Sequence, residues 1–120
     1  MVIHLHSESK IQDYYNFSLL GEKTRQIVDN LNVVIDDNFY PLDKIVDGEI
    51  KPKRINKTNK HQRAIGIGVT GFADLIYSLD LSFEDPRVSE INKLFFSCVY
   101  WNAIFQSVQL SILRGYAPAF

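Results

Sequence analysis

The segment from residue 86 to residue 114 limits most strongly what this chain can fold into. Its apolar side chains recur at helical spacing but spread over most of the circumference of a helix: Val88, Ile91, Leu94, Phe95, Cys98, Val99, Trp101, Phe105, Val108, Ile112 and Leu113. A helix that is apolar on most sides has to be covered on most sides. We expect Asp85 to cap this helix, Pro86 to take its first position and Gly115 to end it.

The rest of the chain offers little cover for such a helix. With 120 residues, the sequence has the length of one ordinary domain, and 46% of it is apolar, which is too hydrophobic for a disordered chain. One further long helix and one short strand cannot surround residues 86–114. The sequence therefore predicts a single partial domain over residues 1–120 that packs against further protein.

Residues 94–113 carry no charge and are about as long as the roughly twenty residues that a membrane-spanning helix needs. Asn102, Gln106 and Gln109 lie near the middle of this stretch, where a bilayer would penalise them. A helix buried in protein, with hydrogen-bonded amides, is the better interpretation. The first ten residues do not have the pattern of a signal peptide, so we expect a cytoplasmic protein without a membrane partner.

Charge and cysteine content exclude several classes of function. Lys plus Arg number 13 and Asp plus Glu number 14, so a basic footprint for nucleic acid would have to be local. The basic run from Lys51 to Arg63 contains no aromatic residue for base stacking and is interpreted as a solvated loop, with no nucleic-acid partner. The single cysteine, Cys98, excludes an internal disulfide and is expected to pack as a buried thiol. His4, His6 and His61 lack the spacing of a metal site.

The remaining pattern predicts few regular elements. A helix should begin at Asp13 or Asn16 and end near Asp36, with a buried stripe of Leu20, Ile27, Leu31, Val34 and Ile35. Residues 42–62 show little periodicity and are expected to form a long polar loop. Residues 63–69 alternate branched and small side chains, which is typical of a strand, and a short helix should follow with Phe72, Leu75, Ile76 and Leu79. The expected class is mainly α with one or two short strands, and residues 2–5 are the candidate for the second strand.

Gly66, Gly68 and Gly71 form a G-x-G-x-x-G string between the expected strand and the expected short helix. In a dinucleotide-binding fold, such a string follows a hydrophobic strand and precedes an acidic residue at the end of a second strand. Here a polar, basic segment precedes Gly66, and the acidic residues about twenty positions later begin a helix. Close packing of the backbone is therefore favoured over cofactor binding, and no cofactor is expected.

Several strings, taken in order and spacing, resemble the large subunit of ribonucleotide reductase. They are Asn30-Leu31-Asn32, Ile35-Asp36, Asn38-Phe39-Tyr40-Pro41, His61 with Arg63, residues 65–69, Gly71-Phe72-Ala73-Asp74, Phe83-Glu84 and Asn92-Lys93. The resemblance extends from about Tyr14 to Phe120. It covers a middle slice of a much longer protein.

The resemblance implies a fragment of a ten-stranded α/β barrel. It also implies reduction of ribonucleoside diphosphates, with a small subunit that supplies a radical. The family's radical cysteine, its redox cysteine pair and its substrate-phosphate loop have no counterparts in these 120 residues. We therefore expect no catalytic, cofactor-binding or metal-binding residue, and we assign structural motif positions only: Asn38, Tyr40, Pro41, Gly66, Gly68, Gly71 and Asp74.

Two further expectations follow from the resemblance. Residues from about Val46 to Lys57 are extra relative to the family's usual path, so this basic loop is an insertion. Ala64, Gly66 and Gly68 should face the barrel interior, while Ile65, Ile67 and Val69 meet outer helices. The leading hypothesis is a scaffold segment that partners the remaining large-subunit segments and, through them, the small subunit. We expect this segment to be inactive alone. The alternative is a non-enzymatic interaction module derived from that subunit.

Overall fold

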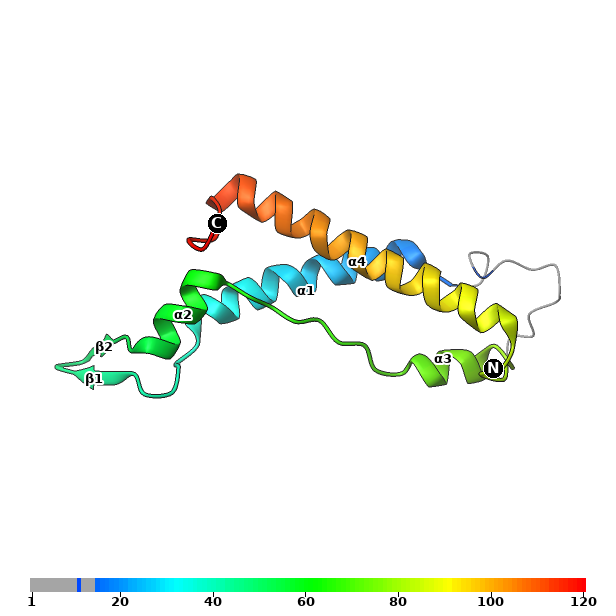
Figure 1. Ribbon diagram of the computed structural model, residues 1–120, viewed down its shortest axis with the longest axis horizontal. Coiled ribbons are helices and arrows are strands. Elements are labelled where there is room, and N and C mark those ends of the chain that lie inside the picture. The colour runs from blue at the N-terminus through cyan, green and yellow to red at the C-terminus, as the bar shows by residue number, and fades with distance from the viewer. Residues whose placement is uncertain (1–10, 12–14) are drawn as a thin grey trace. The chain divides into compact units, whose positions relative to one another are not determined.

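The computed structural model describes residue 11 and residues 15–120, which are mostly helical with two short antiparallel strands. The elements in chain order are α1 (Phe17–Asp37), β1 (Lys44–Val46), β2 (Glu49–Lys51), α2 (Arg54–Gln62), α3 (Phe72–Ser78) and α4 (Pro86–Arg114) (Figure 1). They form two compact units. The first contains residues up to Thr24 and residues 67–103, and the second contains residues 25–66 and 104–120.

The ends of the two long helices confirm the capping predictions. The Asn16 side chain accepts a hydrogen bond from the Leu19 amide at 2.9 Å, and Asp85 accepts one from the Arg87 amide at 2.9 Å. Gly115, with φ of 85°, ends α4 and donates its amide to the Ser111 carbonyl at 3.0 Å. Asp13 lies outside the described residues. Local sequence signals therefore set the bounds of α1 and α4.

The core of the first unit forms around α3 and the first turns of α4. Ile76 is fully buried, and Leu79, Val88 and Ile91 are buried against it; Ile11 completes the cluster. Aromatic rings extend this core, and the Phe72 and Phe95 ring centroids lie 5.6 Å apart. The predicted short helix and its apolar face are thus confirmed.

The buried stripe of α1 differs from the prediction. Ile27 and Val34, which were assigned to that stripe, are 42% and 53% exposed, whereas Gly21, Thr24 and Val28 are buried. A Cβ atom added to Gly21 would lie 2.8 Å from the Asn102 side-chain nitrogen, so this glycine permits a close approach to α4. Thr24 satisfies its hydroxyl within its own helix by donating to the Leu20 carbonyl at 2.8 Å. The prediction was right for Ile35, which is buried, and for Leu20 and Leu31, which are half-buried. Counting only large apolar residues missed Gly21 and Thr24.

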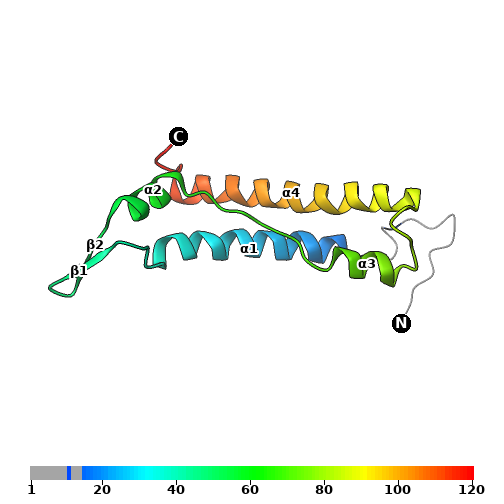
Figure 2. The ribbon, with the colours of Figure 1, turned by 60° about the horizontal axis from the view of Figure 1, so that its bottom comes forward.

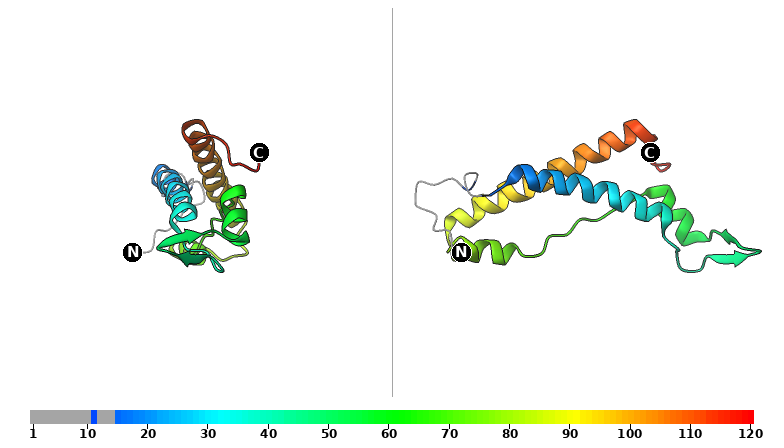
Figure 3. Two further views of the ribbon diagram at one scale, coloured as in Figure 1. Left: turned by 90° about the vertical axis from the view of Figure 1, so that its left-hand side faces the viewer. Right: turned by 180° about the vertical axis from the view of Figure 1, so that it is seen from behind.

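The expectation of a long polar loop over residues 42–62 was also wrong. Residues 44–51 form a β1–β2 hairpin with the register Lys44↔Lys51, Ile45↔Ile50 and Val46↔Glu49, and α2 follows (Figure 3). Asp47 and Gly48, with φ of 53° and 80°, make the two-residue turn. Asp-Gly between branched residues is a strong hairpin signal, which the search for longer periodicity missed.

The predicted strand at residues 63–69 is not a regular strand in the described part of the chain. The segment between α2 and α3 has no ladder partner there and is drawn as a coil (Figure 2). Its burial alternates only from residue 66 onward: Ile67 and Val69 are half-buried and Gly66 and Gly68 are exposed, whereas Ile65 of the same predicted face is 37% exposed. A strand needs the backbone of a neighbour, and this neighbour is missing among the described residues.

The opposite side of α4 from its buried residues exposes a large apolar face. Its members are Tyr100, Trp101, Ile104, Phe105, Val108 and Ile112, and Tyr100 and Trp101 are 71% and 69% exposed. Two of the three amides expected to be hydrogen-bonded within this helix are so: Asn102 donates to the Cys98 carbonyl at 2.8 Å, and Gln106 donates to Asp29 at 2.7 Å. None of the helices in residues 15–120 combines the length and apolar character that crossing a membrane requires.

The exposed face of α4 predicts the behaviour of the isolated chain. We expect the purified chain to elute in size-exclusion chromatography as species larger than 13.8 kDa and to bind a hydrophobic dye. Replacing Ile104 and Ile112 with glutamate should reduce both signals, because two charges then interrupt the face. A clean monomer with one sharp thermal transition would contradict this expectation.

Candidate functional site

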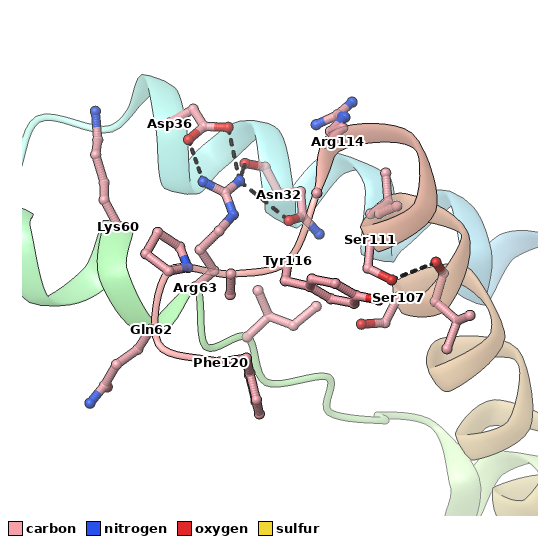
Figure 4. A pocket seen from close by; sticks show the side chains of 16 residues that line it. Asn32, Asp36, Lys60, Gln62, Arg63, Ser107, Ser111, Arg114, Tyr116 and Phe120 are labelled. Carbon is pink, nitrogen blue, oxygen red and sulfur yellow. Dashed lines mark hydrogen bonds and ion pairs between the residues drawn. The ribbon is translucent and has the colours of Figure 1, made fainter.

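Arg63 forms the most connected polar site in the second unit. It follows α2 directly in a left-handed conformation, with φ of 50°, and its amide donates to the Asn59 carbonyl at 2.8 Å. Its guanidinium grips Asp36 of α1 with two hydrogen bonds, Nη1 to Oδ1 at 2.7 Å and Nη2 to Oδ2 at 2.9 Å (Figure 4). Longer contacts of 3.3 and 3.4 Å reach the Asn32 carbonyl and side-chain oxygen. Arg63 thereby fixes the start of the glycine-rich segment to α1.

The ion pair sets the electrostatics of this site. The hydrogen bond from Arg63 lowers the pKa of Asp36, and the charges of Arg63, Lys60 and Arg114 lower it further. The same bond raises the pKa of Arg63. The pair is partly exposed, with 24% of the Arg63 side chain and 45% of the Asp36 side chain accessible, so solvent screens it. The pair mainly fixes the relative orientation of the two side chains, because a planar guanidinium donates two parallel hydrogen bonds to the carboxylate.

A cavity of about 540 Å³ lies beside this ion pair. Its walls combine Asn32 and Asp36 of α1, Arg63, the end of α4 and the segment after it, including Ser107, Ser111 and Tyr116 (Figure 4). The segment after α4 returns to α2, where the Ala119 amide donates to the His61 carbonyl at 3.1 Å. The cavity lining includes neither a cysteine nor a histidine, so it lacks an activated nucleophile with a neighbouring base.

The Asn38-Tyr40-Pro41 motif ends α1 and leads into the hairpin. The Asn38 amide donates to the Val34 carbonyl at 3.0 Å. Tyr40 is buried, and its hydroxyl donates to the Ile35 carbonyl at 2.8 Å, while its own carbonyl accepts the Asp43 amide at 3.2 Å. Pro41 is exposed. Tyr40 therefore fastens the turn to the end of α1.

The three glycines of the G-x-G-x-x-G string have different surroundings. Gly71 adopts φ of 79° before α3, where a side chain would be strained. A Cβ atom added to Gly66 or Gly68 would meet nothing within 4 Å, and Asp74 is exposed. α3 has only seven residues, and the described residues contain no paired strand before Gly66. The arrangement thus lacks the strand and the long helix of a dinucleotide site.

Cys98 lies in the first unit and packs between helices. Its half-buried thiol lies 3.5 Å from the Phe17 carbonyl, and the Asn102 amide nitrogen lies 3.6 Å from its sulfur. Nearby, burial is the main cause that raises the pKa of Tyr15, with a smaller electrostatic contribution from Cys98. His61 lies in the other unit, whereas His4 and His6 lie outside the described residues. Within residues 15–120 and residue 11, no group of three or more histidine, cysteine or carboxylate side chains could hold a metal ion.

Comparison with known proteins shows the family. Residues 2–120 match the family described as ribonucleotide reductase, barrel domain. The chain is 33% identical over 102 residues to the ribonucleoside-diphosphate reductase large subunit of Arabidopsis thaliana, which covers 85% of the chain and 11% of that subunit. It is 35% identical over 105 residues to the vaccinia virus large subunit and 34% identical over 101 residues to the Danio rerio one, covering 88% and 84% of the chain and 12% of each relative.

The chain belongs to the ribonucleotide reductase barrel-domain family. It spans only about a tenth of the length of the large subunits that it matches. The family resemblance drawn from the Asn38–Pro41 and Gly66–Asp74 strings is therefore confirmed. The helical structure is compatible with a piece of a barrel, although the described residues do not themselves close one.

The Arg63–Asp36 pair leads to a pH-dependent prediction. Replacing Arg63 with glutamine should raise the Asp36 pKa toward its ordinary value of 3.8, because the largest cause of its depression is removed. Lys60→Gln should raise that pKa less. The carboxyl carbon of Asp36, followed by NMR in aspartate-labelled protein, reports the titration.

The sign of the stability effect follows from the lowered pKa. A carboxylate with a depressed folded-state pKa stabilises the fold above its unfolded pKa, and this contribution is lost as the pH falls through the folded pKa. The Arg63 contribution should therefore be fully present at pH 5–7 and be lost progressively as the pH falls below about 4 and through the lowered pKa of Asp36. An Asp36 titration that is unchanged by Arg63→Gln would contradict the assigned cause.

Proposed function

We propose that this chain is a scaffold segment of a ribonucleoside-diphosphate reductase large subunit and contributes no reacting group. It acts in assembly with the remaining large-subunit segments, which carry the reactive cysteines, and through them with the radical-supplying small subunit in the cytoplasm. The observation that carries this proposal is the unpaired segment between Arg63 and Gly71. The α4 face supports it independently.

Residues 64–70 have the features of a β-strand whose neighbouring strands are missing among the described residues. Backbone hydrogen bonds join none of these seven residues to another part of the described chain. Ile67 and Val69 are half-buried on one side, and the bare glycines at 66 and 68 leave open space on the other. An unpaired strand edge is a template for another strand, and in a barrel each strand has two neighbours. We assign Ala64, Gly66 and Gly68 to the barrel interior, where small residues leave room for an entering loop.

The exposed face of α4 provides a second incomplete surface. Trp101, Phe105, Val108 and Ile112 recur at a spacing that aligns them along one side of the helix. Complete burial of one such side chain contributes about 1.5–3 kcal/mol. A partner that covered this side would therefore gain a large apolar contribution. Barrel segments outside these residues are the partner that the family membership suggests.

The cysteine content supports a scaffold role. The resemblance implies a reaction that uses a radical cysteine and a reducing cysteine pair, whereas this sequence holds Cys98 alone. Cys98 makes packing contacts with Phe17 and Asn102 rather than lining the cavity beside Arg63. The alternative, a non-enzymatic interaction module, predicts stable behaviour without barrel segments.

Complementation tests the proposal directly. The vaccinia virus large subunit is produced as two fragments that flank its matched 105 residues, and this chain is added. We expect a stoichiometric complex in size-exclusion chromatography, and reductase activity only when both fragments, this chain and a small subunit are present. The matched vaccinia segment is the positive control for assembly.

Two results would contradict the proposal. The first is deoxynucleotide formation by this chain with a small subunit and reductant alone. The second is a failure of this chain to join the flanking fragments under conditions in which the matched vaccinia segment does so.

Cys98 gives a separate prediction within the same assembly. Cys98→Ala should leave turnover per assembled complex unchanged, because the thiol only packs between helices. The cavity should lower the stability of the assembly by about 1–2 kcal/mol, measured as a shift in the denaturant midpoint. Loss of turnover in a folded complex would instead assign chemistry to Cys98.

A further inference from the structure

The segment after Arg63 has two unlike faces and few contacts that hold it in place. Ala64 and the glycines at 66 and 68 alternate with branched residues at 65, 67 and 69. In an extended chain, these two sets point to opposite sides. Backbone hydrogen bonds join none of residues 64–70 to another described residue. A glycine-rich strand specifies its register weakly, because one of its faces carries almost no side chain that packs against a neighbour.

The register of this strand decides which set of side chains enters the barrel. A slip by one residue exchanges the two faces of a strand. In the register assigned under the scaffold role, the small side chains face the barrel interior and leave room for an entering loop. A slipped strand would turn Ile65 and Ile67 inward, and their branched side chains would fill that room. A fixed point outside the strand is therefore required to set its register.

Arg63 has the properties of such a fixed point. It immediately precedes the segment, and its guanidinium donates to both carboxylate oxygens of Asp36, at 2.7 and 2.9 Å (Figure 4). Two parallel bonds to a planar group fix its orientation as well as its position. The Arg63 amide also donates to the Asn59 carbonyl at 2.8 Å. The side chain and the main chain of one residue are thus attached to α1 and to α2.

The backbone of Arg63 adopts a conformation that depends on such contacts. Its φ of 50° and ψ of 34° lie in the left-handed region, which is unfavourable for a residue with a β-carbon. A conformation of this kind persists where the surrounding contacts over-determine it. Asn32 adds to them, since its carbonyl and side-chain oxygens lie 3.3 and 3.4 Å from Nη2 of Arg63. The contacts of Arg63 therefore set the direction in which the chain leaves α2 and enters residues 64–66.

The neighbouring cations do not provide an equivalent fixed point. Lys60 and Arg114 line the cavity beside the pair, and their charges act on Asp36. Among the described residues, the hydrogen bonds and the ion pair of the Asp36 carboxylate are made by Arg63. Lys60 is therefore a matched control, because its removal changes the charge near Asp36 and leaves both Arg63 bonds in place.

We propose that Arg63 is a positioning residue, whose two hydrogen bonds to Asp36 set the register of residues 64–70 in the barrel and thereby the turnover of the assembled reductase. The inference rests on the scaffold role proposed above. Arg63 contacts no reacting group, and it acts through the side chains that the strand presents to the interior. Loss of the pair leaves assembly largely intact, because a partly exposed ion pair adds little stability, but it admits a slipped strand.

Turnover in the reconstituted complex tests the proposal. The full chain, carrying Arg63→Gln or Asp36→Asn, is assembled with the two vaccinia fragments and a small subunit. We expect each variant to join the complex and to lower kcat per complex by roughly tenfold to a hundredfold, with little change in KM. The double variant should lose no more than either single one, because both changes remove the same interaction. Lys60→Gln should keep full turnover.

A conservative variant separates orientation from charge. Arg63→Lys keeps the positive charge beside Asp36 but cannot donate two parallel hydrogen bonds from a planar group. We expect it to recover only a minor part of the turnover that Arg63→Gln loses. Full recovery by the lysine would show that charge is sufficient and would overturn the positioning role.

Isoleucine methyl NMR on the same complex reports the register independently of turnover. With the unchanged chain, the methyl groups of Ile65 and Ile67 should each give one signal. With Arg63→Gln, these signals should shift or double, because the side chains then sample the opposite face of the strand. Ile76, which is fully buried in the core of the first unit, should keep its signal and serves as the reference.

The outcomes distinguish this proposal from the scaffold role. A chain that does not join the fragments contradicts both. Full turnover of assembled Arg63→Gln, or unchanged Ile65 and Ile67 signals in it, overturns the positioning role alone. An equal loss of turnover in Lys60→Gln also overturns it, since the effect would then be one of charge. Failure of only the Arg63→Gln chain to assemble would make the pair a stabilising contact and would overturn it as well.

Discussion

The apolar surface of α4 determines how the rest of this chain can be organised. One side of the helix packs in each unit through residues such as Phe95 and Leu110, and the opposite side, from Tyr100 to Ile112, is left to solvent. The incomplete strand at residues 64–70 has the same character, because its backbone groups lack neighbours. Both features indicate a structure that is completed by other protein.

The Arg63–Asp36 pair positions the start of this incomplete strand. It holds the beginning of the glycine-rich segment against α1, while Gly71 turns the other end into α3. The start of the segment is therefore fixed within the second unit before any neighbour arrives, which lowers the entropic cost of pairing there. A segment anchored in this way is suited to a scaffold, whose contribution is the position of its backbone rather than a reacting side chain.

The sequence predicted elements whose signals are local. Asn16, Asp85 and Gly115 are caps, and they gave the bounds of α1 and α4; the strings around Gly66 and Asp74 gave the family. It predicted the buried face of α1 only in part: Ile35 is buried as expected, but Gly21 and Thr24 were missed, because they are buried through their contact geometry and not through hydrophobicity. The Arg63–Asp36 contact joins residues 27 positions apart, and no periodic pattern in the sequence indicates it. The Asp47-Gly48 dipeptide is a recognisable hairpin-turn signal, but the surrounding charges and the lack of periodicity favoured a loop.

Amide hydrogen exchange at residues 64–70 tests the central claim most directly. The account predicts rapid exchange of these amides in the isolated chain and strong protection once the flanking large-subunit fragments are bound, because barrel neighbours then accept their hydrogen bonds. The amides within α2 serve as an internal reference that should change little. Rapid exchange at residues 64–70 in a stable complex, or protection already present in the isolated chain, would contradict the role of this segment as an incomplete barrel strand.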